Sequence, residues 1–341
     1  MQGQLLNTVT FSEMTDLIRK EFVHIQSMAV PASKQLYIFA PVATGNGNTK
    51  RFDEVDTQTF ARLKRQGEAA KKVSTGVGYN VTMTKKRIAA EIDITQEMRD
   101  ENRYPEVGTL ITGLGHFCPQ RIELDGTHLL TFASSTSYTD MDGDSNTISV
   151  GDGLALLSTV HTLKFSSSTY SNRVSGDPIF SAGSLELAEE LATTNILSNF
   201  GEKRVMNFNV IVTSQDPNTV NTVKRYLNSV SDVDQNNSGV TNVYNGKYRH
   251  IQLPYLATTA TGANDSTKKK WWFLAAIGQG TNGWQAYYGE WEAPHFKEMP
   301  KGEAGANHDY SRDIWTFGVR AGYAYRAVTG RGIIGSLPTS A

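Results

Sequence analysis

The chain has 341 residues with 33 basic and 34 acidic side chains, so its formal net charge is −1. This near-neutral balance weighs against a dedicated nucleic-acid binder, because no attracting field for a polyanion surrounds the whole molecule. Hydrophobic residues make up 39% and charged residues 20%, which excludes a disordered chain and a membrane protein and indicates a soluble globular protein. The single cysteine, Cys118, excludes a disulfide framework and a multi-cysteine zinc site.

The amino-terminal segment contains no secretory signal, and the chain has no window of 18 apolar residues. We therefore expect synthesis in the cytoplasm and no contact with a membrane. Thr10 and Glu13 form a capping box, and apolar residues follow at helical spacing as far as Met28. This pattern predicts an amphipathic helix that Pro31 ends. A short β-rich run follows at 36–40.

Residues 47–92 are predicted to form two long, thinly buried strands of a protruding hairpin, because they are rich in Thr, Val and Tyr and lack a core stripe. Residues 50–90 carry ten basic and four acidic side chains, a net charge of +6. The remaining chain must then carry about −7. The candidate contact residues of this arm are Arg62, Lys64, Arg65, Lys71, Lys72, Lys85, Lys86 and Arg87.

Helical spacing of apolar residues returns after Thr95 and continues to about residue 132, with Pro119 predicting a kink or a break. Residues 133–150 are predicted to form a surface loop. Residues 151–163 are predicted to form a buried helix of about three turns, and another helix is predicted after Ser184.

Residues 205–213 alternate between apolar and polar side chains, which predicts a half-buried strand. Asp216 and Pro217 are an N-cap and first-turn pair that should open a helix. Further strands are predicted at 247–256, 270–277, 284–292 and 314–328, after a long polar loop at 229–246. Helices and strands follow no βαβ rhythm, so we predict an α+β fold with a mostly antiparallel sheet.

Sequence motifs for chemistry are absent or incomplete. The seven histidines are scattered, and the acidic run 140–146 has Ser145 and Gly151 where a calcium loop needs Gly and Glu. The glycines 330, 332 and 335 match a dinucleotide pattern, but only six residues follow them and the required helix is missing. Cys118 is predicted to be a small buried hydrophobe. We expect no enzyme, no metal and no cofactor.

Five strings in order resemble segments of the major capsid protein of tailed bacteriophages, a fold shared with the herpesvirus shell. AAEIDITQEMRDENRYPEV resembles the junction of the sheet with the spine helix, and DGLALLSTVHTL with FSAGSLELAEEL resembles two later head-protein segments. VMNFNVIVTSQDPNTVNTVKRYL resembles the start of the axial domain, and SRDIWTFGVRAGYAYRAVTGRGIIGS resembles the closing peripheral strand. Leu157 and Thr162 stand where relatives have Phe and Pro, a departure that concerns packing.

The resemblance implies a division of the chain into an amino-terminal arm, an extended loop that lies over a neighbouring subunit, and peripheral and axial domains. Residues 133–182 form a connecting segment that is assigned to neither domain. The implied boundaries are 1–46 for the arm, 47–92 for the extended β-hairpin loop, 93–132 for the peripheral domain with its spine helix, 183–293 for the axial domain and 294–341 for the return strand of the peripheral domain.

The implied function is a virion protein that self-assembles into hexamers and pentamers of an icosahedral head shell around double-stranded DNA, bound without sequence specificity. Implied partners are a portal, a decoration protein and a scaffolding protein, which the short arm leads us to expect as a separate chain. One family branch joins an extended-loop lysine to a neighbour's asparagine with help from a buried glutamate. Lys71, Lys72 and Asn307 could supply the first two, but residues 314–335 contain no Asp or Glu. We therefore predict a noncovalent shell.

The alternative from a different class is a nucleic-acid-binding protein. It would use the basic arm at 50–87 and the run Lys268–Lys270, with Trp271 and Trp272 stacking on bases. The more favoured interpretation of this run is that the lysines solvate a loop and the tryptophans enter a strand.

Overall fold

The structure, a computed structural model, describes residues 20, 23–24, 31–41, 47–58, 60–101, 104–231, 240–297, 308–309 and 313–339. Most of the predicted amino-terminal helix and Asn307 lie outside the described residues. None of the helices in the described part has the length and apolar character that a membrane crossing requires.

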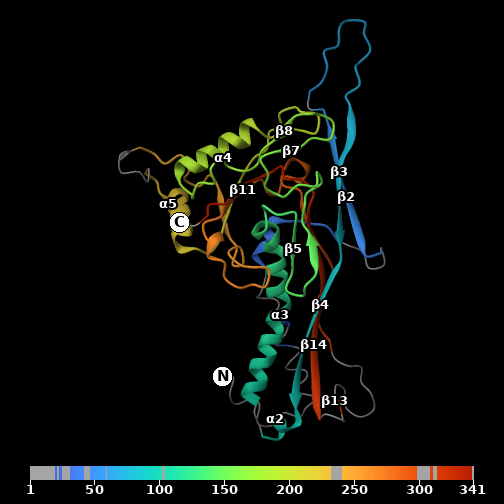
Figure 1. Cartoon of the computed structure of the whole chain (residues 1–341), viewed down its shortest axis with the longest axis vertical. Coiled ribbons are helices and arrows are strands. Elements are labelled where there is room, and N and C mark those ends of the chain that lie inside the picture. Colours follow the sequence, from blue (N-terminus) through green and yellow to red (C-terminus); the bar gives the residue numbers. More distant parts are fainter. Residues whose placement is uncertain are drawn as a thin grey trace.

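A long sheet and a long helix lie side by side along the molecule (Figure 1). In this sheet β14 pairs antiparallel with β4 on one side and with β12 on the other, and β1 pairs with β12 in parallel. The short β13 also pairs with β14. The strands are β1 (Ile38–Phe39), β4 (Lys86–Thr95), β12 (Ala286–Lys297), β13 (His308–Asp309) and β14 (Ile314–Ala327). The strand predicted at 314–328 is therefore confirmed, but it is not the last element, because β15 (Ile333–Ser336) follows it.

Helix α3 (Tyr104–Thr131) follows the short α2 (Gln96–Asp100) and packs against the long sheet and against the 3₁₀ turn η1 (Ala32–Leu36). The predicted break at Pro119 does not occur, because the helix continues through this residue. Its buried side chains form one stripe on both sides of the proline, including Leu114, Cys118 and Ile122. Packing of this stripe against the sheet offsets the loss of one backbone hydrogen bond.

A second, four-stranded sheet has the order β10-β9-β11-β15. Its elements are β9 (Val210–Thr213), β10 (Arg249–Gln252), β11 (Trp272–Ala275) and β15 (Ile333–Ser336), with α4 (Ala182–Thr194), α5 (Pro217–Asn228) and the turns η3 (Ser266–Lys268) and η4 (Gly280–Asn282). The predicted cap of α5 is present, since Asp216 accepts a bond from the Thr219 amide. Helix α4 begins at Ala182 and not after Ser184, because Ser181 is its N-cap. The prediction of a half-buried strand at 205–213 is wrong, because the strand covers only 210–213 and all four of its residues are buried. Both faces are covered: Val210 and Val212 belong to the larger apolar cluster, and Ile211 belongs to the cluster under α4 and α5.

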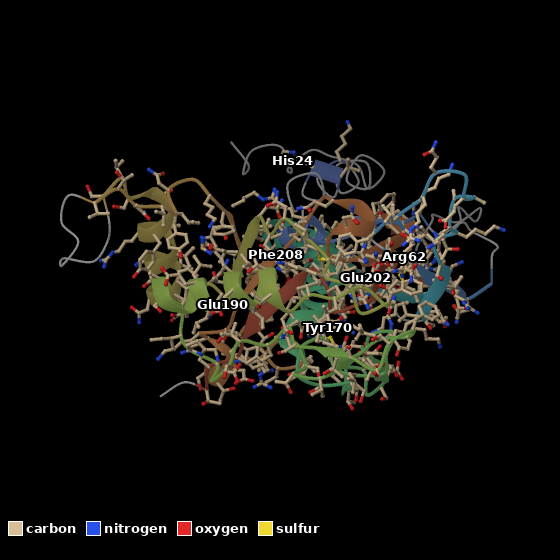
Figure 2. The ribbon with its side chains drawn as sticks, turned by 90° about the horizontal axis from the view of Figure 1, so that it is seen from above. His24, Arg62, Tyr170, Glu190, Glu202 and Phe208 are labelled. Carbon is tan, nitrogen blue, oxygen red and sulfur yellow. The ribbon has the colours of Figure 1, made fainter. Side chains whose placement is uncertain are left out.

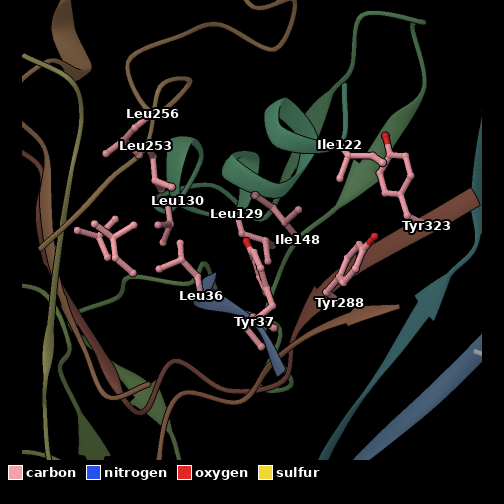
Figure 3. Close-up of a cluster of buried hydrophobic side chains, with 14 of the residues drawn as sticks. Leu36, Tyr37, Ile122, Leu129, Leu130, Ile148, Leu253, Leu256, Tyr288 and Tyr323 are labelled. Atoms are coloured by element: carbon pink, nitrogen blue, oxygen red, sulfur yellow. The ribbon is translucent and has the colours of Figure 1, made fainter. Parts of the chain in front are cut away.

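Two apolar clusters form the interior. The larger one lies between α3 and both sheets, and includes Ile122, Leu130 and Tyr323 (Figure 3). The smaller one lies under α4 and α5, where Leu185 and Leu227 contact the face of the second sheet that carries Trp272. Both sheets thus share one core, and α4 and α5 cover the opposite face of the second.

The segment 151–163 is not the helix that we predicted. It consists of turns followed by β7 (His161–Thr162), which pairs with β8 (Thr169–Tyr170). The carboxylate of Asp152 accepts hydrogen bonds from the amides of Leu154 and Thr162 and contacts Nδ1 of His161 at 2.7 Å. These bonds replace helical ones, since an aspartate can satisfy nearby backbone donors in a turn. The predicted loop at 133–150 likewise contains a small hairpin, β5 (Ser137–Thr139) and β6 (Ser145–Thr147).

The protruding hairpin consists of β2 (Thr49–Thr57) and β3 (Thr75–Thr84), which pair antiparallel with a register shift between Asp53 and Val55. Residues 58–74 continue beyond the paired strands and form the tip, which extends past the body in Figure 1. The next strand, β4, was expected to belong to the hairpin, but it pairs with β14 over its whole length.

Candidate subunit interface

The tip, residues 58–74, gathers positive charge at one end of the molecule. It carries five basic side chains against the single acidic Glu68, a net charge of +4. All five are exposed, and within the described residues none of them forms an ion pair. They are Arg62, Lys64, Arg65, Lys71 and Lys72. Figure 2 shows Arg62 on the hairpin side, far from Glu190 of α4.

The same part of the hairpin exposes apolar side chains. Phe60 is 61% exposed and Leu63 is 78% exposed in the tip. Val55 and Val77 face each other across the two strands and are also exposed. Apolar residues beside a cluster of cations are typical of a surface that a partner covers.

The structure separates the other three predicted contact residues from the tip. Lys86 lies 3.3 Å from Asp140 and 4.0 Å from Asp125, and Arg87 lies 3.2 Å from Glu292. These residues lie at the start of β4, in the same subunit as their partners. We conclude that Lys86 and Arg87 stabilise the subunit's own fold.

The neighbouring Lys85 also contacts its own chain, since its Nζ lies 5.7 Å from the centre of the Trp291 ring. Of the eight predicted contact residues, the structure therefore brings five together at the tip and leaves three at β4.

The base of the hairpin contains two buried carboxylates that sequence reasoning counted only as charge. Glu54 is 2% exposed and Asp56 is 7% exposed, and both lie on the face of β2 that meets the body. Glu54 contacts Arg331, and Asp56 accepts a 2.8 Å hydrogen bond from the backbone amide of Asn199. Their spacing of two residues puts them on one face of a strand, but nothing in the sequence says that this face is inward.

The end of the molecule opposite the tip is acidic. Residues 91–106 contain six acidic and two basic side chains, a net charge of −4. Glu91 and Asp93 are exposed on β4, and Glu97 is exposed on α2. In Figure 1, α2 lies at the end of the long axis opposite the tip. The subunit therefore carries opposite charges at its two ends.

The nucleic-acid alternative loses its stacking residues in the structure. Trp271 is 9% exposed and Trp272 is fully buried, so neither presents a face to a base. Lys268 bonds to its own chain, with Nζ 3.1 Å from Asp265 and 3.1 Å from the carbonyl of Thr258. The interpretation that the tryptophans enter a strand is confirmed for Trp272, which opens β11.

Motifs with a possible metal or nucleotide role have ordinary structural explanations. The Asp140 carboxylate accepts bonds from the amides of Asp142 and Asp144 and from Asn146, so it organises the β5–β6 turn. No group of three His, Cys, Asp or Glu side chains among the described residues could hold a metal ion. Cys118 is buried, and burial raises the pKa of its thiol to about 12.

A cavity of about 570 Å³ lies between α3, the β5–β6 hairpin and β14. His128 lines it and is 1% exposed, and neither of its ring nitrogens has a hydrogen-bond partner. Burial is the main cause that lowers the pKa of His128 to about 4; the charge of Asp125 opposes it, and the nearby cations Lys86, Arg121 and Lys268 act in the same direction as burial. This histidine is neutral at physiological pH.

No family model matches the chain, and no curated protein matches it. Several solved phage structures are similar to it over most of its length. A chain from the capsid structure of the cyanophage P-SCSP1u is 10% identical, with 90% of this chain and 88% of that chain covered and a TM-score of 0.49.

A chain from the procapsid of bacteriophage JBD30 is 12% identical, with 98% of this chain and 77% of that chain covered and a TM-score of 0.46. A chain from the mature capsid of bacteriophage PhiM1 is 12% identical, with 89% of this chain and 85% of that chain covered and a TM-score of 0.47. At these identities and TM-scores the likeness does not by itself assign a function.

Proposed function

We propose that this chain is the major capsid protein of a tailed bacteriophage. Its role is structural, and copies of it assemble into the hexamers and pentamers of an icosahedral head shell around double-stranded DNA. The observation that carries the proposal is the hairpin whose exposed tip, with a charge of +4, extends past one end of a subunit whose other end is acidic. A hairpin of this kind needs a second surface to cover it.

Opposite charges at the two ends favour a head-to-tail contact, in which the tip of one subunit meets a different surface of the next. Such heterologous contacts close into rings when the rotation between subunits divides a full turn. Hexamers and pentamers are rings of this type, and they require that one contact tolerates two slightly different rotations. A contact made by an extended tip fits this requirement, because residues 60–73 belong to no strand.

The tip supplies both the charge and the apolar surface that a repeated contact needs. Exposed ion pairs are worth only about 0–1 kcal/mol each, so charge mainly sets orientation and the rate of encounter. Burial of Phe60 and Leu63 supplies affinity at about 25 cal/mol per Å² of apolar surface covered. A net charge of −1 for the whole chain suits a shell that encloses DNA without binding it tightly.

The further partners are a portal, a scaffolding protein and a decoration protein, and the mature location is the virion after synthesis in the host cytoplasm. In the proposed domain scheme, residues 1–46 are the amino-terminal arm, 47–92 the extended loop, 93–132 and 294–341 the peripheral domain, and 183–293 the axial domain, with 133–182 connecting them. We propose three changes at its boundaries: β4 and β12 pair with β14 and go with the peripheral domain, and β15 pairs with β11 and goes with the axial domain.

The test is electron microscopy and light scattering of the purified full-length chain. Shells, tubes or rings of five and six subunits support the proposal. A stable monomer that binds DNA with a steep dependence on salt concentration would overturn it and favour the nucleic-acid alternative.

A further inference from the structure

Three side chains from distant parts of the chain form a closed set of contacts at the base of the hairpin. Arg331 is 1% exposed, and its guanidinium contacts Glu54 Oε1 and donates a 2.8 Å hydrogen bond to Oδ1 of Asn199. The amide of Asn199 donates in turn to Oε2 of Glu54 at 2.9 Å. The three residues come from the turn before β15, the segment after α4, and β2.

A second carboxylate on the same face of β2 strengthens this attachment. Asp56 accepts a bond from the backbone amide of Asn199, and its Oδ1 lies 3.7 Å from Arg204. Charges as deeply buried as Glu54 and Arg331 are retained only when they are paired and hydrogen-bonded. The network pairs both charges through the terminal nitrogens of Arg331, while its buried Nε has no hydrogen-bond partner among the described residues. Arg331 also lies over the Tyr170 ring at 5.4 Å.

Glycines bring the second strand of the hairpin close to the same residues. A Cβ added at Gly78 would lie 2.6 Å from Nδ2 of Asn199 and 2.9 Å from Oε2 of Glu54. A Cβ at Gly76 would lie 2.5 Å from the Phe165 ring. The close approach therefore requires glycine at two alternate positions on one face of β3.

Beyond this attachment the hairpin has no comparable support. Side chains 61–75 are all exposed, and within the described residues the five tip cations form no ion pair. Ten extended residues from Asp56 to Gln66 span at most about 33 Å. A tilt of roughly 10° at the base would then move the tip by up to about 6 Å, which is enough to lose a specific contact.

We propose that Glu54, Asn199 and Arg331 form a positioning joint that sets the direction of the hairpin inside each subunit before the tip meets a neighbour. The purpose of the joint depends on the proposed function, whereas its effect on the hairpin does not. Val81, Met83 and Phe52 still hold the start of the hairpin on the body, so loss of the joint leaves a folded subunit in which the outer part of the hairpin and its tip point in many directions. This lowers the yield of regular shells.

The test measures the hairpin direction by spin labels on the full-length subunit. Thr75→Cys on β3 and Thr193→Cys on α4 are both exposed, and Cys118 is buried and stays unlabelled. The joint is removed in one variant by Glu54→Gln with Arg331→Met, which replaces both charges together and avoids an unpaired one. Gly78→Ala perturbs the joint with no change of charge. The matched control is Glu123→Gln, a buried glutamate that bonds Ser33 far from the hairpin.

We expect a narrow distance distribution in the labelled parent and in the control, and a distribution at least twice as broad in both joint variants with unchanged circular dichroism. An unchanged distribution in a folded joint variant would overturn the proposal. If the double variant does not fold, the width of the distance distribution in Gly78→Ala tests the proposal instead. The measurement uses unassembled subunits, so failure of the parent chain to form shells would count against the proposed function and not against the joint.

Discussion

The hydroxyl of Tyr323 in β14 donates a 2.6 Å hydrogen bond to Oδ2 of Asp125 in α3. Both side chains are buried, so a polar contact joins the long helix and the long strand inside their interface. A second one lies close by, since the hydroxyl of Tyr325 in β14 donates to the carbonyl of Ile122 in α3 at 3.2 Å. Arg121 donates to Oδ1 of the Asp125 carboxylate at 3.2 Å, and Lys86 lies 4.0 Å away. These contacts fix how far the helix can slide along the strand, because apolar packing alone tolerates small shifts.

We expect Tyr323→Phe to lower the free energy of unfolding by about 2 kcal/mol, because a buried carboxylate loses one of its donors. Urea denaturation followed by circular dichroism and by tryptophan fluorescence measures the change. The matched control is Tyr79→Phe, whose hydroxyl bonds Thr162 at an exposed position and should cost less than about 0.5 kcal/mol. Equal losses in the two variants would contradict the importance of the Asp125 contact.

The buried His128 predicts a loss of stability in mild acid. Its pKa is lowered from the ordinary 6.5 to about 4 by burial and by nearby cations. The unfolded chain therefore binds a proton near pH 6.5 while the folded chain does not. The unfolding free energy should fall between pH 6.5 and 4 by up to about 3 kcal/mol from this group, and the loss should level off below pH 4.

Denaturation of wild type and His128→Phe at pH 7 and pH 4.5 measures this contribution. The variant should lose less stability between the two values, since phenylalanine can pack against Phe132 and Tyr138 as the imidazole does. His250 should contribute in the same direction, because burial and the charge of Lys224 lower its pKa to about 4. The exposed His295→Gln serves as the control, and a variant with an unchanged pH dependence would refute the assignment.

The tip cations predict an assembly that depends on salt. Replacing Arg62, Lys64, Arg65, Lys71 and Lys72 with Gln should reduce the rate of assembly at low salt at least tenfold, because steering by complementary charge is lost. Light scattering at several NaCl concentrations measures the rate of assembly. Glu68→Gln raises the tip charge by one and should have the opposite effect. Equal rates in all three proteins would show that the tip charge plays no part.

The apolar tip residues predict a separate effect on affinity. Leu63→Ser should raise the subunit concentration needed for assembly at least tenfold without affecting the melting temperature, because Leu63 is 78% exposed in the isolated subunit. The exposed Val205→Ser, on the segment before β9, is the control. A lower melting temperature in Leu63→Ser would instead indicate a role within the subunit.

The absence of Asp and Glu from residues 314–335 predicts a noncovalent shell. Assembled protein boiled in denaturant should therefore run as a monomer of 37.5 kDa in electrophoresis. A ladder of covalent oligomers would contradict this prediction. Lys71→Arg with Lys72→Arg would then test whether these lysines form the links, since arginine keeps the charge but not the amine.

Local signals in the sequence predicted those elements that short-range chemistry determines. Asp216 and Pro217 start α5 because a cap and a first-turn proline need only the next three residues. The alternation in 314–328 predicted β14 because one face of a strand is buried along its length. The α+β class and the protruding hairpin were likewise predicted from patterns within short stretches of the sequence.

Only the tertiary structure decided the roles of the charged residues in the arm. Lys86 and Arg62 look alike in sequence, yet Lys86 pairs with Asp140 and Arg62 stays exposed at the tip. Glu54 appeared to be one more surface charge, but it meets Arg331, 277 positions away. The sequence by itself determined local conformation and the division of charge along the chain. Which charges became buried and paired depended on the topology that brings distant segments together, because the energy of a charge depends on its surroundings in space.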